Sequence, residues 1–170
     1  GGEIRFHCRL EDVLLRGGAL QGVLLRDVRT GREERVDASE LVLAVGHSAR
    51  DTFRMLHGRG FAMQAREFAV GVRIEHLQEK IDIAQYGHKR GALPVADYKL
   101  VSHAGERTAF TFCMCPGGYV MPAASEAGGV VTNGMSDYAR DAVNANSALL
   151  AQVRLSDFDR GGVLDGVEFQ

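Results

Sequence analysis

The sequence predicts an α+β protein, built mainly from antiparallel β-sheet with few helices. Glycine is abundant and proline scarce, 21 and 3 of 170 residues, which favours many tight turns between short strands over a helical bundle. Apolar and polar residues also alternate with a period of two in several stretches, the pattern of half-buried strands. These stretches are 4–9, 68–76 and 110–115.

Composition narrows the class of protein. Hydrophobic residues make up 45% and charged residues 25%, ordinary values for a globular chain long enough to bury a core. The formal net charge of −2 indicates neither nucleic acid nor an anionic membrane as partner. No apolar run approaches the roughly 20 residues of a membrane span, and no signal peptide is visible. Three cysteines without a secretory signal predict reduced thiols and a cytoplasmic location.

Residues 3–45 are predicted to form a β-meander of short strands separated by glycine turns. Its last segment, 41–45, is an unbroken apolar run, which is typical of a strand buried on both faces of a parallel sheet. A helix is predicted to follow, with Ser48 as its N-cap and Gly58 to Gly60 ending it. Gly46 between strand and helix fits either an ordinary connection or a backbone that approaches a ligand at the carboxyl end of the strand.

The strand predicted at 68–76 places Arg73 and Glu75 on one face. Such a pair is either a solvated surface ion pair or part of a cavity lining. Residues 77–93 are polar and poorly periodic, so we expect a loop there with at most one helical turn.

The stretch from Phe110 to Tyr119 is the most distinctive part of the sequence. Its alternation predicts a strand with Cys113 and Cys115 on one face and Phe112 and Met114 on the core face. The strand should break at 116–118, because proline cannot donate to a sheet and glycine permits unusual backbone. A β-hairpin with incidental cysteines is the simplest alternative.

Two other chemistries are weaker alternatives for these cysteines. A zinc site would need more ligands than one C-x-C provides. A thiol hydrolase would need a base for Cys113, and the spacing favours neither His76 nor His103.

Beyond this stretch, a turn is predicted at 132–134 and a short helix after Ser136. Residues 147–155 fit a helix or a strand. A strand is preferred, after a break at 144–146, because a continued helix would bury the Asn146 amide.

Several of these strings together resemble a known family, the bacterial uncharacterised FAD-dependent dehydrogenases. They are related in fold to the glutathione-reductase-type superfamily, and the resemblance runs from about Ile4 to Gln170. The strings that carry it are Leu-Ala-Val-Gly-His-Ser-Ala-Arg-Asp at 43–51, Phe-Ala-Val-Gly-Val-Arg-Ile-Glu-His at 68–76, Phe-Cys-Met-Cys-Pro-Gly-Gly at 112–118, Asn-Gly-Met-Ser at 133–136 and Asn-Ala-Asn-Ser at 144–147.

The resemblance implies a piece of a larger flavoenzyme. Such enzymes hold the FAD pyrophosphate on a G-x-G-x-x-G turn, which this sequence lacks. Residues 1–60 would then be the C-terminal part of an FAD-binding domain, made of the β-meander, the strand and the helix. Residues 61–170 would form a second, substrate-binding or cap domain. The parent would transfer hydride between an unknown substrate and the flavin, whereas the fragment alone is expected to be inactive and to bind FAD weakly or not at all.

The resemblance also implies roles for individual residues. The expected partners are the remaining FAD-binding segments of the parent and a small-molecule substrate, with no nucleic acid, membrane or metal. The rival hypothesis is a non-catalytic, β-rich binding or interaction domain. The implied site residues are Gly46, His47, Ser48, Gly117 and Gly118 for the cofactor, Cys113 and Cys115 for redox catalysis, and Arg73, Glu75, His76, Asn133 and Arg140 for the substrate.

Overall fold

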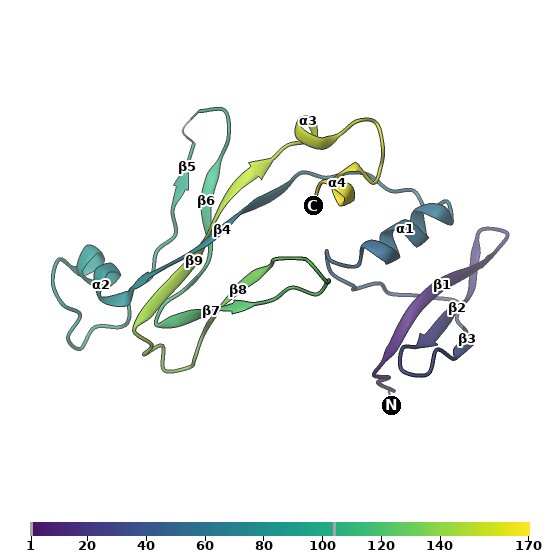
Figure 1. The fold of residues 1–170 in the computed structure, drawn as a ribbon, viewed down its shortest axis with the longest axis horizontal. Helices are drawn as coiled ribbons and strands as arrows, with labels where there is room; N and C mark the ends of the chain where they lie inside the picture. Colours follow the sequence, from purple (N-terminus) through teal and green to yellow (C-terminus); the bar gives the residue numbers. More distant parts are fainter. Residues whose placement is uncertain (1, 104) are drawn as a thin grey trace. The chain divides into compact units, whose positions relative to one another are not determined.

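The computed structural model describes residues 2–103 and 105–170, which form two compact units (Figure 1). One unit comprises the chain up to Ala65 together with Asp159–Gln170, and the other comprises Arg66–Phe158. Both contain antiparallel sheet and short helices, so the predicted α+β class is confirmed. No helix within the described ranges is long and apolar enough to cross a membrane.

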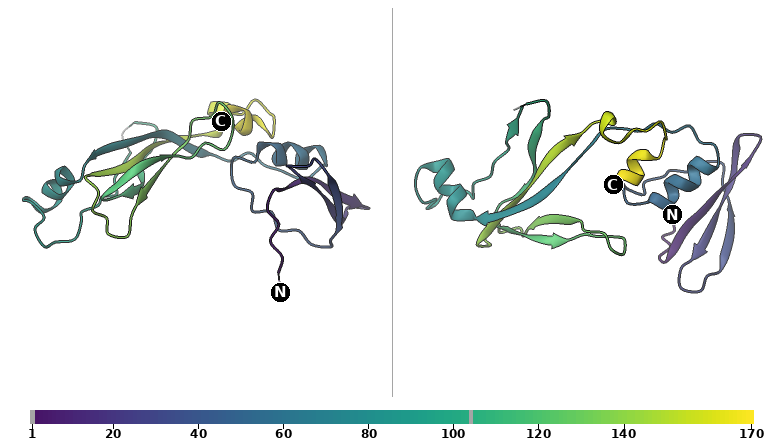
Figure 2. Two further views of the ribbon diagram at one scale, coloured as in Figure 1. Left: turned by 60° about the horizontal axis from the view of Figure 1, so that its bottom comes forward. Right: turned by 45° about the horizontal axis from the view of Figure 1, so that its top comes forward.

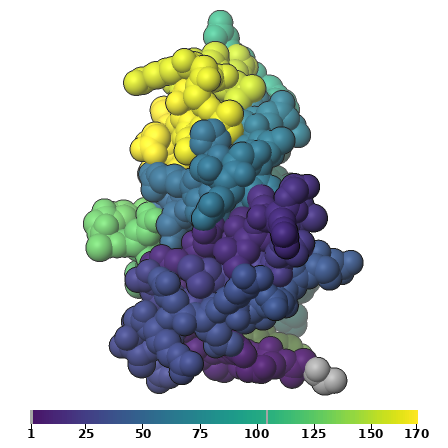
Figure 3. Space-filling view, turned by 90° about the vertical axis from the view of Figure 1, so that its right-hand side faces the viewer, coloured from purple at the N-terminus to yellow at the C-terminus, as the bar shows by residue number. Residues whose placement is uncertain are grey.

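The first unit contains the predicted β-meander, with strand order β1-β2-β3. The strands are β1 (Cys8–Arg16), β2 (Ala19–Asp27) and β3 (Glu33–Asp37). Val13 and Val23 pair across β1 and β2 and are both buried, so they form the centre of this small core. Figure 3 shows the meander, coloured purple to blue, as a continuous surface.

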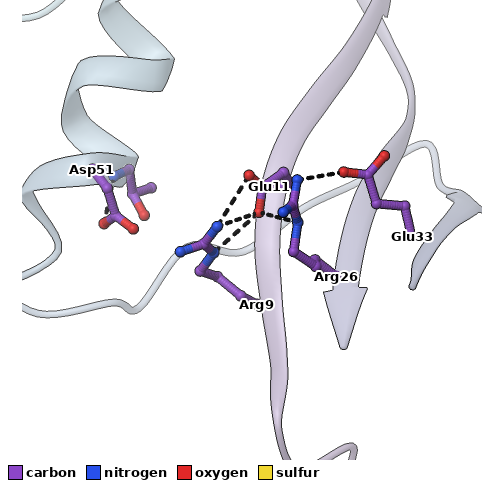
Figure 4. A network of polar contacts seen from close by, with 6 residues as sticks. Arg9, Glu11, Arg26, Glu33 and Asp51 are labelled. Atoms are coloured by element: carbon purple, nitrogen blue, oxygen red, sulfur yellow. Dashed lines mark hydrogen bonds and ion pairs between the residues drawn. The ribbon is translucent and has the colours of Figure 1, made fainter. Parts of the chain in front are cut away.

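A chain of ion pairs links the three strands across the surface of this sheet (Figure 4). Glu11 lies 2.7 Å from Arg9 and 3.3 Å from Arg26, and Arg26 reaches Glu33 at 2.5 Å. All four side chains are partly exposed, so each pair contributes little to stability, and cross-strand pairs of opposite charge favour the observed register.

Helix α1 (Arg50–Gly58) forms where it was predicted, but Ser48 is not its N-cap. The N-cap is Ala49, without a side-chain hydrogen bond, and the Ser48 hydroxyl instead lies 3.4 Å from His47 Nε2. At the other end, the Arg59 guanidinium contacts both carboxylate oxygens of Asp12. Hydrogen bonding to Arg59 lowers the pKa of Asp12, and this ion pair fixes the end of α1 to β1.

The prediction of a strand at 41–45 is wrong for this chain. These residues have irregular structure, and 91% of the Val42 surface is exposed. A strand of this kind needs hydrogen-bonded neighbours and cover on both faces. Among the strands described, none pairs with this segment, so its apolar side chains lie in solvent.

The second unit is built on a four-stranded antiparallel sheet with the order β4-β9-β6-β5. Its strands are β4 (Phe68–Leu77), β5 (Val101–Ser102), β6 (Ala109–Cys115) and β9 (Asn144–Val153). Strand β4 matches its prediction. Strand β9 confirms the choice of strand over helix, but the predicted break at 144–146 is wrong because those residues pair with β4.

A second hairpin lies beside this sheet in the same unit (Figure 2). It consists of β7 (Gly118–Pro122) and β8 (Thr132–Ser136), so the predicted turn at 132–134 is wrong. The helix predicted after Ser136 is also wrong. Instead, the Ser136 hydroxyl donates to the Pro116 carbonyl at 2.7 Å and holds the hairpin to the end of β6.

Helix α2 (Gln78–Tyr86) occupies part of the predicted loop. Its buried face is polar, with Gln78 and Asp82 instead of apolar residues, which explains why hydrophobic periodicity gave no signal. The Gln78 amide donates to Asp82 and to the Ala96 carbonyl, both at 2.9 Å. Two short helices follow the sheet, α3 (Leu155–Phe158) in this unit and α4 (Asp165–Phe169) in the first unit.

Candidate functional site

One end of the four-stranded sheet brings several predicted residues together. The register of β4 with β9 places Arg73 and Glu75 on the same face as Asn146, as predicted for the first two. His76 lies on the opposite face. The sheet therefore separates His76 from Arg73 and Glu75.

Arg73 makes two hydrogen bonds at this end of the sheet. Its Nη1 donates to Asn146 Oδ1 at 2.7 Å and to the Cys113 carbonyl at 3.1 Å. Asn146 is completely buried, and Arg73 is partly buried. A β4 side chain, a β9 side chain and the β6 backbone thus meet at one guanidinium.

A β-bulge in β6 explains this geometry and overturns one prediction. The pairing with β9 shifts between Phe112 and Cys115, and Cys113 adopts a positive φ of 49°. A bulge breaks the alternation of side chains. As a result Cys113 is exposed, Cys115 is buried, and Phe112, expected in the core, is 60% exposed.

The two thiols therefore have different chemistry. Burial raises the pKa of Cys115, and the nearby Cys113 raises it further, while Arg73 opposes both effects. The Cys115 thiol lies 3.4 Å from the Cys113 carbonyl, to which it donates. Cys115 is thus a protected, protonated thiol, and of the two only Cys113 has the access that thiol chemistry needs.

Cys113 is expected to react with a maleimide at least about tenfold faster than Cys115 at pH 7.5, because the thiolate is the nucleophile and must be reachable. The measurement is mass spectrometry of peptides from a Cys113→Ser variant and a Cys115→Ser variant. In denaturant the two rates should converge. Equal rates in the folded protein would contradict the burial of Cys115.

The turn at Pro116 and Gly117 is held from two sides. The Gly117 N–H donates to the buried Gln78 Oε1 at 2.8 Å, and Gly117 has a φ of +49°. A Cβ at Gly117 would overlap the Arg140 backbone, and one at Gly118 would overlap the Met135 carbonyl. These close approaches are made to the chain's own backbone, and both glycines are needed for them.

Sequence reasoning missed Gly134 and the role of Asn146. A Cβ at Gly134 would overlap Asn146 Oδ1 and Arg73 Nη1 and would lie 2.7 Å from Cys115 Sγ. Gly134 therefore lets β8 lie directly over Arg73, Asn146 and Cys115, which we call the Arg73 group. The signal was the Asn-Gly pair, which was interpreted as a turn.

The other predicted substrate residues lie in separate surroundings. Glu75 accepts from Asn144, and Asn133 Oδ1 accepts from the Gly134 N–H at 2.9 Å. His76 Nε2 lies 2.8 Å from the Tyr98 hydroxyl on the other face of the sheet, and burial raises the pKa of Tyr98. Arg140 lines an open pocket of about 580 Å³. The remaining lining residues are Met114, Cys115, Pro116, Gly134, Met135, Ser136, Asp137 and Tyr138.

The predicted cofactor residues Gly46, His47 and Ser48 belong to the first unit. Gly46 has a φ of +74°, and a Cβ there would meet no atom within 4 Å. The position thus requires glycine for its backbone and faces open space, which is compatible with a ligand.

The described residues bring together neither the ligands of a zinc site nor the Cys–His pair of a thiol hydrolase. Within 2–103 and 105–170, no group of three or more His, Cys, Asp and Glu side chains could hold a metal ion. His76 bonds to Tyr98, and His103 Nδ1 lies 3.2 Å from the Thr108 hydroxyl. Over the same ranges, no hydrogen bond joins a cysteine to a histidine.

Comparison with known proteins supplies the wider context for this sheet and its hairpin. A family described as "FAD-dependent protein, C-terminal domain-like" matches residues 67–170, which include the whole Arg73 group. The chain belongs to this family. An uncharacterised protein of Clostridium beijerinckii is 45% identical to it over 174 residues. That similarity covers 100% of this chain and 32% of the relative, so the chain spans about a third of that protein's length.

Proposed function

We propose that the chain is part of an FAD-dependent oxidoreductase whose complete form transfers hydride between a small-molecule substrate and the flavin. The family match over residues 67–170 carries this proposal. In this reading residues 1–60 are the C-terminal part of the FAD-binding domain, and residues 61–170 are the substrate or cap domain. The flavin supplies the redox chemistry, and the protein supplies binding, orientation and electrostatics.

The residues present fit such a cofactor in part. Gly46 combines a positive φ with open space, which suits a backbone that approaches a ligand. The pyrophosphate-binding G-x-G-x-x-G turn does not occur in the 170 residues. FAD binding therefore needs segments of the parent that are outside this sequence.

Within the second unit the proposed substrate side is the face that carries Arg73. The Arg73 cation supports binding of a polar group. Arg73 also donates to the carbonyl of Cys113, whose exposed thiol lies at the bulge in β6. A role for Cys113 in electron transfer is part of this proposal. Cys115 is better suited to packing, because it is buried and its thiol pKa is raised.

The test compares the full-length parent with the isolated 170-residue chain. The parent is expected to purify yellow with about one flavin per protein, whereas the isolated chain should bind added FAD more weakly than about 100 μM, since it lacks the main phosphate contacts. The flavin absorbance of the purified parent measures its flavin content, and quenching of FAD fluorescence on titration measures the affinity of the isolated chain.

Two outcomes would contradict the proposal in different ways. Micromolar affinity in the isolated chain would show that the missing segments are not needed. A colourless parent that does not bind FAD would favour the non-catalytic binding domain.

A further inference from the structure

We propose that Arg73 and Asn146 form an oxyanion-binding pair that receives the carboxylate of an apolar, monoanionic substrate. The identity of this ligand as the substrate rests on the proposed function. The binding of a carboxylate at these two residues rests on the geometry alone.

The first argument is charge. Arg73 is partly buried, and over 2–103 and 105–170 no carboxylate lies within ion-pair distance of its guanidinium. The acid on its own face, Glu75, accepts from Asn144 instead. Arg107 in the same unit shows the usual arrangement, with Asp157 at 2.5 Å. A cation that is removed from water without a counter-ion carries a desolvation cost that an anion would offset.

The second argument is the pattern of hydrogen-bond donors. Arg73 Nε and Asn146 Nδ2 are both buried and have no acceptor in the described chain. The two side chains are held together by the bond from Arg73 Nη1 to Asn146 Oδ1. Buried donors without partners are rare and costly. A carboxylate has two oxygens and about four acceptor positions, so it could supply the acceptors that these two donors lack.

The third argument concerns the rest of the ligand. In the sheet register Arg73 and Phe112 both pair with Ala148 of β9, from opposite sides. The three residues therefore lie in a row on one face, with the smallest side chain in the middle. Phe112 is 60% exposed, an unusual position for a phenylalanine in a sheet. A ligand with its carboxylate at Arg73 would place its apolar body across Ala148 and against Phe112.

The experiment uses the full-length parent and sodium benzoate as the probe, with binding followed by calorimetry at constant ionic strength. Wild type should bind benzoate, and benzyl alcohol, which lacks the charge, should bind at least about tenfold more weakly. Arg73→Met should weaken the binding of benzoate by roughly tenfold or more. Asn146→Asp should do the same while the protein stays folded, because the new carboxylate would pair with Arg73.

Arg107→Met is the matched control, since its charge already has a partner in Asp157. It should leave benzoate binding unchanged. No benzoate binding in wild type, an equal loss in Arg107→Met, or full binding in Asn146→Asp would each overturn the proposal. Tighter binding of inorganic phosphate than of benzoate would overturn the carboxylate assignment.

These outcomes are separable from those of the proposed function, because flavin content is measured independently. Benzoate binding by a flavin-free parent would keep this inference and count against the oxidoreductase. A flavin-loaded parent without benzoate binding would refute this inference alone.

Discussion

Gly117→Ala is expected to lower the free energy of unfolding of the Arg66–Phe158 unit by about 2–5 kcal/mol. The residue has a φ of +49°, which costs an L-residue about 1–2 kcal/mol. The new Cβ would also overlap the Arg140 carbonyl, a backbone group that cannot rotate away. Relief of that overlap would move either the turn after β6 or the segment that holds Arg140. Urea denaturation followed by tyrosine fluorescence measures the loss.

Gly87→Ala separates the two causes. Gly87 lies at the C-cap of α2 with a φ of +75°, and a Cβ there would meet no atom within 4 Å. Its substitution should therefore cost only the backbone term, about 1–2 kcal/mol. If the two variants lost the same stability, the close approach of Gly117 to Arg140 would have no energetic weight.

Gly46→Val is expected to reduce the flavin content of the full-length parent at least about tenfold while the protein stays folded. The added side chain would point into space that is open in this chain, so it creates no clash of its own. In the proposed flavoenzyme that space belongs to the cofactor, and a branched side chain would exclude it. The ratio of flavin to protein absorbance after purification measures the effect.

Gly31→Val is the matched control in the same unit. Gly31 has a similar φ of +72° and equally open surroundings, but it lies in the turn between β2 and β3. The Gly31→Val variant should lose about as much stability as Gly46→Val but keep its flavin. Full flavin content in Gly46→Val would leave Gly46 as a turn residue only.

One apolar segment lies outside every strand of the described fold. Residues 41–45 carry the composition of a central strand, yet they are exposed here. Such a run forms a strand only where neighbouring strands pair with it and both faces are covered. A prediction from an apolar run alone assumes that such neighbours exist, and no strand among the described residues pairs with this segment.

Several features were determined by the sequence by itself. The alternation of apolar and polar residues in 68–76 was sufficient to predict strand β4 and to place Arg73 and Glu75 on one face, because side chains alternate along a strand with a period of two. The choice of a strand for β9 was right, but the reason given for it was not, because Asn146 is completely buried in the strand as well. The strings around the two cysteines were specific enough for an FAD-dependent family, which the match over 67–170 bears out.

Only the tertiary structure decided the Arg73 group. The bond from Arg73 to Asn146 joins residues 73 positions apart, and its geometry depends on the register of β4 with β9. The bulge that separates Cys113 from Cys115 arises from the pairing of β6 with β9, so period two could not reveal it. Likewise, Gly117 and Gly134 were visible as glycines, but the backbone and side chains that they admit come from distant segments. Local patterns fix local conformation, whereas these contacts depend on which strands become neighbours.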